Sequence, residues 1–238
     1  MDEEWRSVMA TGQRRSSMRE RFREQVREDV KAVALEQLAE GGAQTISLNA
    51  IAKRLGVSGP ALYRYYANRD ELLNELVIDA YHDLRDALAS ASAGSARVRR
   101  PEQRMRELAH AYRQWAREHP HRYELLFRPP FPGYDAHAEP IAEAASTLML
   151  PVLDVLDGNE DDDVQYVVRV WSRMHGIVSL ELGGAYTAMD IDADALYADE
   201  IQTIIERYHR EPEAPDGVDV VVNHGEVRGR GGPGDSQG

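Results

Sequence analysis

Apolar residues recur three and four positions apart over most of this 238-residue chain, and glycine, proline and polar clusters interrupt the pattern at intervals. Such spacing places the apolar side chains on one face of a helix. The pattern therefore indicates an all-α fold, with a brief strand-like stretch, VDVVV, near the C-terminus. The predicted helices cover residues 18–40, 69–91, 101–119, 140–156, 164–182 and 196–209, with a shorter amphipathic piece over 123–127; within 140–156, Pro151 predicts a kink or a break.

The first predicted helix, from Met18 to Glu40, has one continuous apolar stripe. Gly41 and Gly42 end it, because glycine tolerates the backbone conformation that follows a helix. We expect the stripe to pack against the short helices that come next in the chain. Its members are Phe22, Val26, Val30, Val33, Ala34 and Leu38.

The next stretch, SLNAIAKRLGVSGPALYRYY, runs from Ser47 to Tyr66 and predicts two short helices joined by a tight turn. Ser47 and Ser58 stand where a side-chain oxygen caps a helix N-terminus. Gly56 provides the left-handed conformation of the turn. Pro60 falls in the first turn of the second helix, where its missing N–H has no intrahelical partner to lose.

The second short helix has an inner and an outer face. We expect Leu62 and Tyr66 to face the core, together with Val57 from the turn. The remaining side chains form an outward set that can reach phosphates and base edges: Tyr63, Arg64 and Tyr65.

The two short helices resemble a DNA-binding helix-turn-helix, in which the second helix enters the major groove and the first crosses the backbone. The run GVSGPALYRYYANRDELL, from Gly56 to Leu73, closely resembles the signature of the tetracycline-repressor (TetR) family of bacterial regulators. The resemblance covers roughly residues 20 to 75. It implies a transcriptional repressor that a small-molecule effector releases from operator DNA. For the motif by itself, a helical hairpin without a DNA role is the alternative.

The resemblance also assigns DNA contacts by motif position. Tyr63, Arg64 and Tyr65 would face the groove. Many relatives carry longer side chains at the positions of Gly59 and Pro60, so these two residues let the helix approach the backbone closely but are poor candidates for base contacts. Phosphate contacts are expected from Ser47, Asn49, Ser58 and Arg69.

The formal net charge of −13 at first argues against nucleic acid, which proteins bind by neutralising phosphates. The charge is unevenly distributed. Between residues 14 and 69, eleven Lys and Arg stand against six Asp and Glu, so this segment carries +5 and the rest of the chain −18. A basic head on an acidic body would orient the molecule on DNA.

The chain divides into four segments on these patterns. The predicted helix at 69–91 leaves the DNA-binding segment without a loop, and in the resembling family it transmits movement into that segment; an ordinary structural helix would show the same pattern. The segments are a flexible basic arm over 1–17, a helix-turn-helix DNA-binding domain over 18–67, a helical effector-binding and dimerisation domain over 68–210, and a disordered tail over 211–238.

The run WSRMHGIVSLELGG contains Trp171, His175 and Gly176, and it resembles the C-terminal domain of a TetR subgroup named for these three residue types. Trp171 and His175 are four residues apart, so they are neighbours on one helix face. A histidine there either bonds a core partner or presents a polar group to a ligand. Residues that line an effector pocket, unless they are ordinary core, are Tyr112, Trp115, Phe127, Met149, Trp171 and His175.

Two helices near the C-terminus, 164–182 and 196–209, can form a four-helix dimer interface. A homodimer suits a palindromic operator, because two recognition helices must enter major grooves about 34 Å apart. The partners expected are therefore double-stranded DNA, a second copy of the chain and an unidentified effector. The alternative is a helical DNA-binding or architectural protein without an effector, which would show only salt-sensitive attraction to any DNA.

Other function classes find little support. The chain has no cysteine, no apolar run near the roughly 20 residues of a membrane span, and no signal-peptide core, so we expect a cytoplasmic protein without membrane contact. No nucleophile with a base, no carboxylate pair at a cleft and no metal cluster stands out, so neither an enzyme nor a cofactor is predicted.

Three groups of residues deserve a metal test, and each fails it. Two acidic loops alternate like a calcium-binding loop but lack its glycine, so helix capping is the preferred interpretation. The histidine pair has no third ligand nearby, so no zinc site is predicted. These groups are Asp157, Asn159 and Asp161; Asp190, Asp192 and Asp194; and His119 and His121.

Overall fold

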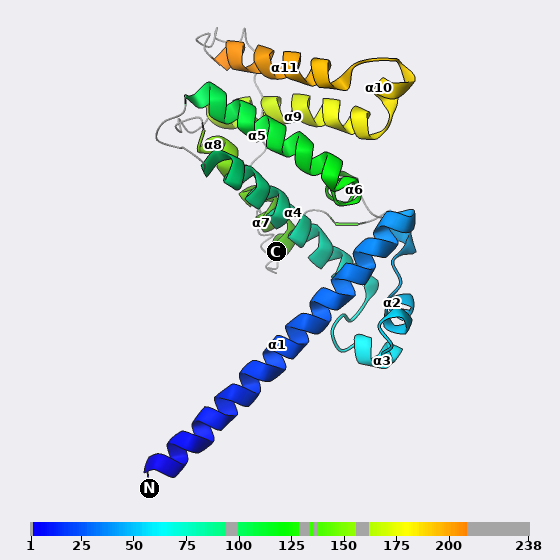
Figure 1. The fold of residues 1–238 in the computed structure, drawn as a ribbon, viewed down its shortest axis with the longest axis vertical. Coiled ribbons are helices and arrows are strands. Elements are labelled where there is room, and N and C mark those ends of the chain that lie inside the picture. The colour runs from blue at the N-terminus through cyan, green and yellow to red at the C-terminus, as the bar shows by residue number, and fades with distance from the viewer. Residues whose placement is uncertain (1, 94–99, 129–133, 136–137, 156–161, 209–238) are drawn as a thin grey trace, which may run out of the picture.

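The computed structural model describes residues 2–93, 100–128, 134–135, 138–155 and 162–208, and every regular element within them is a helix (Figure 1). The predicted all-α fold is confirmed. The N-terminal elements are α1 (Asp2–Gly41), the 3-10 helix η1 (Ala43–Thr45), α2 (Leu48–Arg54) and α3 (Gly59–Leu62). The others are α4 (Arg69–Ala93), α5 (Pro101–Glu118), α6 (Pro120–Phe127), α7 (Glu139–Thr147), α8 (Leu150–Leu153), α9 (Asp162–Leu182), α10 (Ala185–Ala188) and α11 (Ala193–Tyr208).

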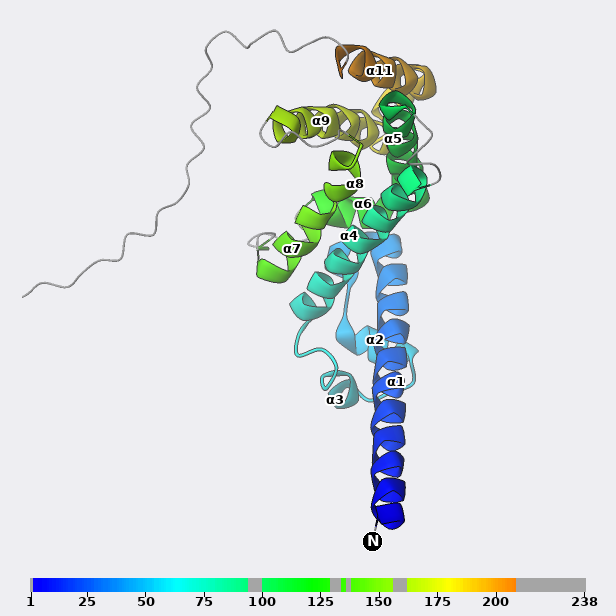
Figure 2. The same cartoon turned by 90° about the vertical axis from the view of Figure 1, so that its left-hand side faces the viewer.

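Two hydrophobic cores organise these helices. We call α1, η1, α2 and α3 the head, and α5 to α11 the body; α4 runs between them (Figures 1 and 2). The head core combines α1 residues such as Val30 with Leu72 from the start of α4, and it also takes Leu125 from α6. The body core contains Leu84 and Leu88 from the second half of α4. Helix α4 is therefore a structural part of both cores.

Helix α1 is longer than predicted, because it begins at Asp2 instead of near Met18, and its N-terminal part projects beyond α2 and α3 (Figure 2). Residues 2–17 contain no proline, so no residue there forces the helix to stop. The predicted stripe holds from Val26 onward but is wrong at Phe22, whose side chain is 65% exposed. Helical spacing identifies a face, and no other described element covers that face at Phe22. The flexibility of the arm stays a prediction.

Prolines set two of the later helix boundaries. The helix predicted over 140–156 is divided into α7 and α8, with Pro151 in the first turn of α8, where its missing N–H is tolerated. Helix α6 begins at Pro120 for the same reason, before the predicted start at Tyr123. The one-turn helix α10 was not predicted, because four residues are too few to show a helical period.

The turn between α2 and α3 depends on glycine and on one backbone hydrogen bond. Gly56 has φ of +68°, as predicted for a left-handed turn. The Val57 N–H donates to the Ala52 carbonyl at 3.0 Å. The Val57 side chain, however, is 43% exposed, so the prediction that it joins the core is wrong. Ser58 occupies the N-cap position of α3, but its side chain makes no capping hydrogen bond.

Replacing Gly56 by Ala should destabilise the protein by about 1 kcal/mol, because an L side chain disfavours positive φ. A Cβ at this position would meet no atom within 4 Å, so the cost lies in the backbone conformation and not in a clash. Gly56→Asn is the matched control, since Asn tolerates the left-handed region better and should lose less. Chemical denaturation measures both changes, and equal losses would contradict this account of the turn.

Candidate functional site

Helices α2 and α3 pack closely against each other. Ala52, Leu62 and Tyr66 are 2%, 1% and 0% exposed, which confirms the inward positions predicted for Leu62 and Tyr66. The small side chain of Ala52 permits the close approach. A Cβ built on Gly59 would lie only 3.2 Å from Asn49 Oδ1. A glycine therefore suits the start of α3.

The outer side of α3 and of the turn after it carries the side chains predicted to face a groove. Tyr63 is 46% exposed and Arg64 is also exposed. Tyr65 is half-buried and packs partly against the head core. Ser58 and Pro60 add exposed surface at the start of α3. This surface lies on the side of the head away from the body (Figures 1 and 2).

Two residues predicted to contact phosphate also hold the head together. The Arg69 guanidinium donates through Nη2 to the Ala43 carbonyl at 2.6 Å, which ties the start of α4 to η1. Ser47 Oγ accepts from the Ala50 N–H at 3.4 Å and caps α2, as predicted. Asn49 is exposed. Phosphate contact by these residues stays a prediction, and Arg69 would have to serve the Ala43 carbonyl as well.

A cluster of ion pairs fastens α1 to α4. Arg27 Nη2 lies 2.6 Å from Glu75 Oε2, and Lys31 Nζ lies 2.7 Å from Asp79 Oδ2. The Arg27 guanidinium also lies over the Tyr66 ring, 4.9 Å from its centroid, just after α3. The sequence reasoning missed this cluster. Its signal is an i,i+4 repeat of charges on each helix, but that repeat cannot indicate which two helices meet.

The cluster keeps its charges at neutral pH. Burial alone would raise the pKa of Glu75, but the hydrogen bond and charge of Arg27 outweigh burial and lower it below its ordinary value. Burial alone would lower the pKa of Lys31, but hydrogen bonds to Asp79 and Glu28 outweigh burial and raise it. The ion pairs therefore persist until the carboxylates are protonated in acid.

Helix α6 links the two cores. Leu125 is buried in the head core, while Tyr123 is buried in the body core. Arg122 Nη1 lies 2.7 Å from Asp83 Oδ2 on α4, and the same carboxylate oxygen accepts from Trp115 Nε1 at 3.0 Å. Because these contacts join α5 and α6 to α4, a shift of α6 acts on α4 and on the head core together.

His175 lies in an aromatic cluster between α5, α6 and α9. Its Nδ1 is 2.8 Å from the Tyr123 hydroxyl and 3.2 Å from the Tyr112 hydroxyl. The imidazole stacks on Trp171 with centroids 5.1 Å apart, and Phe127 meets it edge-on at 4.6 Å. Burial lowers the pKa of His175, so the ring is neutral at neutral pH. The hydrogen-bonded core histidine is thus supported, with tyrosine hydroxyls as its partners.

Two cavities flank this cluster. The inner cavity, between α4, α5, α8 and α9, has a volume of about 20 Å³, which is room for about one water molecule. The outer cavity, between α6 and α9, has a volume of about 80 Å³. The predicted pocket residues are therefore divided: Tyr112, Met149 and Trp171 line the inner cavity, Phe127 and His175 line the outer one, and Trp115 lines neither.

Within the described residues, no group of three or more His, Asp or Glu side chains is arranged to hold a metal ion. Asp192 Oδ1 accepts from the N–H groups of Asp194 and Ala195 at 2.9 and 3.1 Å, which confirms the predicted capping at α11. The other acidic loop, Asp157 to Asp161, lies outside the described residues. No helix in the described part of the chain is both long enough and apolar enough to cross a bilayer.

A glycine turn, an exposed second helix and a supporting α1 define the class of helix-turn-helix DNA-binding proteins. Comparison with protein families agrees. Residues 32–76 match the profile of "Bacterial regulatory proteins, tetR family", and residues 105–204 match "Tetracyclin repressor-like, C-terminal domain". The chain belongs to the TetR family of bacterial transcriptional regulators.

Individual relatives support this assignment across head and body. An uncharacterised HTH-type transcriptional regulator of Mycobacterium tuberculosis is 30% identical over 175 residues, which are 74% of this chain and 78% of that protein. An HTH-type transcriptional regulator of Mycobacterium bovis is 36% identical over 134 residues, which are 56% of this chain and 57% of that protein. The crystal structure of regulatory protein SCO4313 matches with a TM-score of 0.70 and 39% identity, over 79% of this chain and 98% of that chain.

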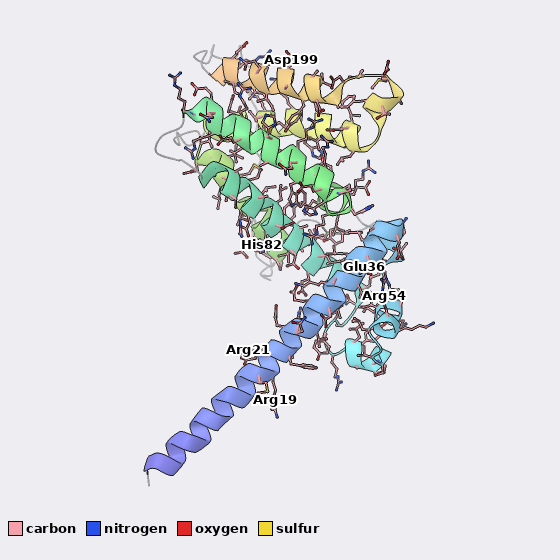
Figure 3. All side chains as sticks on the ribbon, in the orientation of Figure 1. Arg19, Arg21, Glu36, Arg54, His82 and Asp199 are labelled. Carbon is pink, nitrogen blue, oxygen red and sulfur yellow. The ribbon has the colours of Figure 1, made fainter. Side chains whose placement is uncertain are left out.

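Replacing Glu75 by Gln should destabilise the protein by about 1 kcal/mol, because Arg27 loses a charged partner in a half-buried site. The loss should shrink as the pH falls through the lowered pKa of Glu75, where the wild-type carboxylate is protonated too. Glu36→Gln is the control: Glu36 pairs with Arg54, but these side chains are 53% and 50% exposed (Figure 3), so the change should stay below about 0.5 kcal/mol. Denaturant titrations at several pH values measure both.

Proposed function

We propose that this protein is a cytoplasmic, dimeric repressor that binds a palindromic operator through its head and leaves it when a small-molecule effector enters the body. The observation that carries the proposal is the exposed surface of α3 on a head whose core includes residues of α4 and α6. A change in the body can therefore alter the position of the DNA-binding surface.

The DNA contacts follow from exposure and chemistry. Arg64 is exposed beside Tyr63, and a guanidinium can bond both acceptors on a guanine edge in the major groove. Gly59 and Pro60 bring the start of α3 close to a phosphate. Around this centre, phosphate contacts are assigned to Ser47, Asn49, Ser58 and Arg69, and a further groove contact to Tyr65.

The effector response would pass through α4 and α6. The aromatic cluster around His175 contacts α6 through Tyr123, whereas Leu125 two residues later is buried in the head core. An effector that displaces this cluster would shift α6 and α4 and change the spacing of the two heads. Coupling of this kind is typically worth about 1 to 3 kcal/mol.

We assign the body to the TetR subgroup named for Trp, His and Gly. Trp171 and His175 stack on each other and separate the two cavities, which supports a role in the effector site. Gly176 points the other way and is exposed on α9.

The dimer interface is assigned to α9 and α11. Val168 and Leu180 are 49% and 52% exposed on α9, and Gly176 lies between them on the same side. On α11, Leu196 is 36% exposed. Apolar surface of this kind on two neighbouring helices fits burial against a second copy in a four-helix arrangement.

Selection of bound fragments from a genomic library tests the function, followed by competition with unrelated DNA at physiological salt. A repressor retains its own fragments against the competitor, whereas an architectural protein binds both alike. A second candidate, a DNA-binding regulator without an effector, is favoured by the small inner cavity of about 20 Å³. Screening compounds for release of the selected fragment separates the two regulators.

Arg64→Ala should weaken binding to the selected operator by about tenfold or more, because a base contact of this kind contributes about 1 to 3 kcal/mol. The dimer and its melting temperature should not change. Arg85→Ala is the control, since Arg85 lies on α4 and pairs with the neighbouring Asp86 at 2.6 Å. Fluorescence anisotropy measures the affinities, and unchanged binding would remove Arg64 from the contact set.

Val168→Glu should convert the dimer into a monomer, because a charge on the α9 surface would be buried without a partner in the interface. Leu150→Glu is the matched control: Leu150 is 57% exposed on α8, outside the assigned interface, and its change should leave the dimer intact. Sedimentation velocity reports the oligomeric state. Dissociation by both variants, or by neither, would contradict the assignment of α9.

A further inference from the structure

The inner cavity is lined by apolar and aromatic side chains, with no charged or amide group among the lining residues. Its walls come from α4, α5, α7, α8 and α9. Three of the lining residues are methionines, Met105, Met149 and Met174. Unbranched thioether side chains change rotamer easily, so this wall can open for a guest larger than the present 20 Å³ volume. An ionised guest would lose its hydration without a counter-charge, so the cavity selects an uncharged, apolar body.

One polar atom in this wall has no acceptor. Trp171 Nε1 is buried, and no group of the described residues accepts its hydrogen in bonding geometry. The nearby Tyr112 hydroxyl feels the indole N–H, which slightly offsets the rise that burial causes in the pKa of Tyr112. Both side chains line the inner cavity. A buried N–H without an acceptor is uncommon in proteins, because its lost hydration is not replaced.

The hydroxyls beside Trp171 also outnumber their acceptors. The hydroxyls of Tyr112 and Tyr123 both lie within hydrogen-bond distance of His175 Nδ1, which has a single lone pair when it accepts. The other acceptor within reach of Tyr123 is the His175 carbonyl, at 3.4 Å. Burial raises the pKa of Tyr123 to about 12, so the hydroxyl keeps its hydrogen. In the other imidazole tautomer Nδ1 itself donates, and the excess of hydrogens is larger.

We propose that the effector is an uncharged apolar molecule with one hydrogen-bond acceptor oxygen, such as a ketone or an ester. Its apolar part lies among the three methionines, and its oxygen accepts hydrogen bonds from Trp171 Nε1 and the Tyr112 hydroxyl. This inference rests on the proposed effector response, and it names the chemical class that the site takes. Binding would satisfy the orphan indole and rearrange the contact of Tyr112 with His175.

The test uses four six-carbon probes on the full-length protein without DNA: 2-hexanone, hexane, hexanoate and hexylammonium. Calorimetric titration and thermal shift should show that 2-hexanone binds about tenfold or more tightly than each of the others, since one buried hydrogen bond or one uncompensated charge makes at least that difference. Tighter binding of hexanoate or hexylammonium, or no binding of any probe, would overturn the proposal.

Trp171→Phe removes the indole N–H and keeps an aromatic ring, so it should abolish the preference for 2-hexanone over hexane. Trp115→Phe is the matched control, because Trp115 Nε1 donates to Asp83 at 3.0 Å outside both cavities, and this variant should retain the preference. Tyr112→Phe provides a second variant if Trp171→Phe fails to fold, and it should reduce the preference. An unchanged preference in the cavity variants would exclude these donors.

Operator release is measured separately. If 2-hexanone binds but does not release the operator, the ligand class stands and the proposed effector response fails. If the protein binds no operator at all, the repressor function fails, and the calorimetric result still decides the ligand class.

Discussion

Helix α4 is buried at both of its ends in different cores, and this constraint governs the rest of the structure. Leu72 and Leu73 are fully buried in the head, while Leu84 is fully buried in the body. A helix moves as a unit when both ends are packed, so the head cannot change position without a response in the body. Helix α6 adds a second link, since it contributes Tyr123 to one core and Leu125 to the other.

Electrostatics reinforces this connection and limits what the head offers to DNA. At least four of the eleven basic residues between 14 and 69 contact carboxylates or a carbonyl within the protein: Arg27, Lys31, Arg54 and Arg69. Their charges are partly neutralised, so the +5 of this segment overstates the charge that phosphates meet. The exposed surface at Tyr63 and Arg64 is therefore the more informative feature of the head, because it also carries the groups that read bases.

The body places its polar groups in the wall between two cavities. His175 takes hydroxyls from two different helices at Nδ1, and Trp171 stacks on it. A polar cluster whose members are not all satisfied is sensitive to a guest that supplies the missing partner. Its contact with α6 puts this sensitivity next to the element that reaches the head core.

The sequence by itself determined the helices and the local geometry of the DNA-binding motif. Gly56 marks the turn, Leu62 and Tyr66 mark its inner side, and Pro151 marks a break, because each depends on a residue's own backbone preference or on a period within one helix. The periodicity also gave the right face of α1, although it extended that face to Phe22, where packing ends.

Only the tertiary structure decided which helices meet. The pairing of Arg27 with Glu75 and the bond of Trp115 to Asp83 join residues far apart in the chain. So does the division of the six expected pocket residues between two cavities. Charge and apolar spacing along one helix define a face, but the partner of that face depends on how all the helices fill the two cores together.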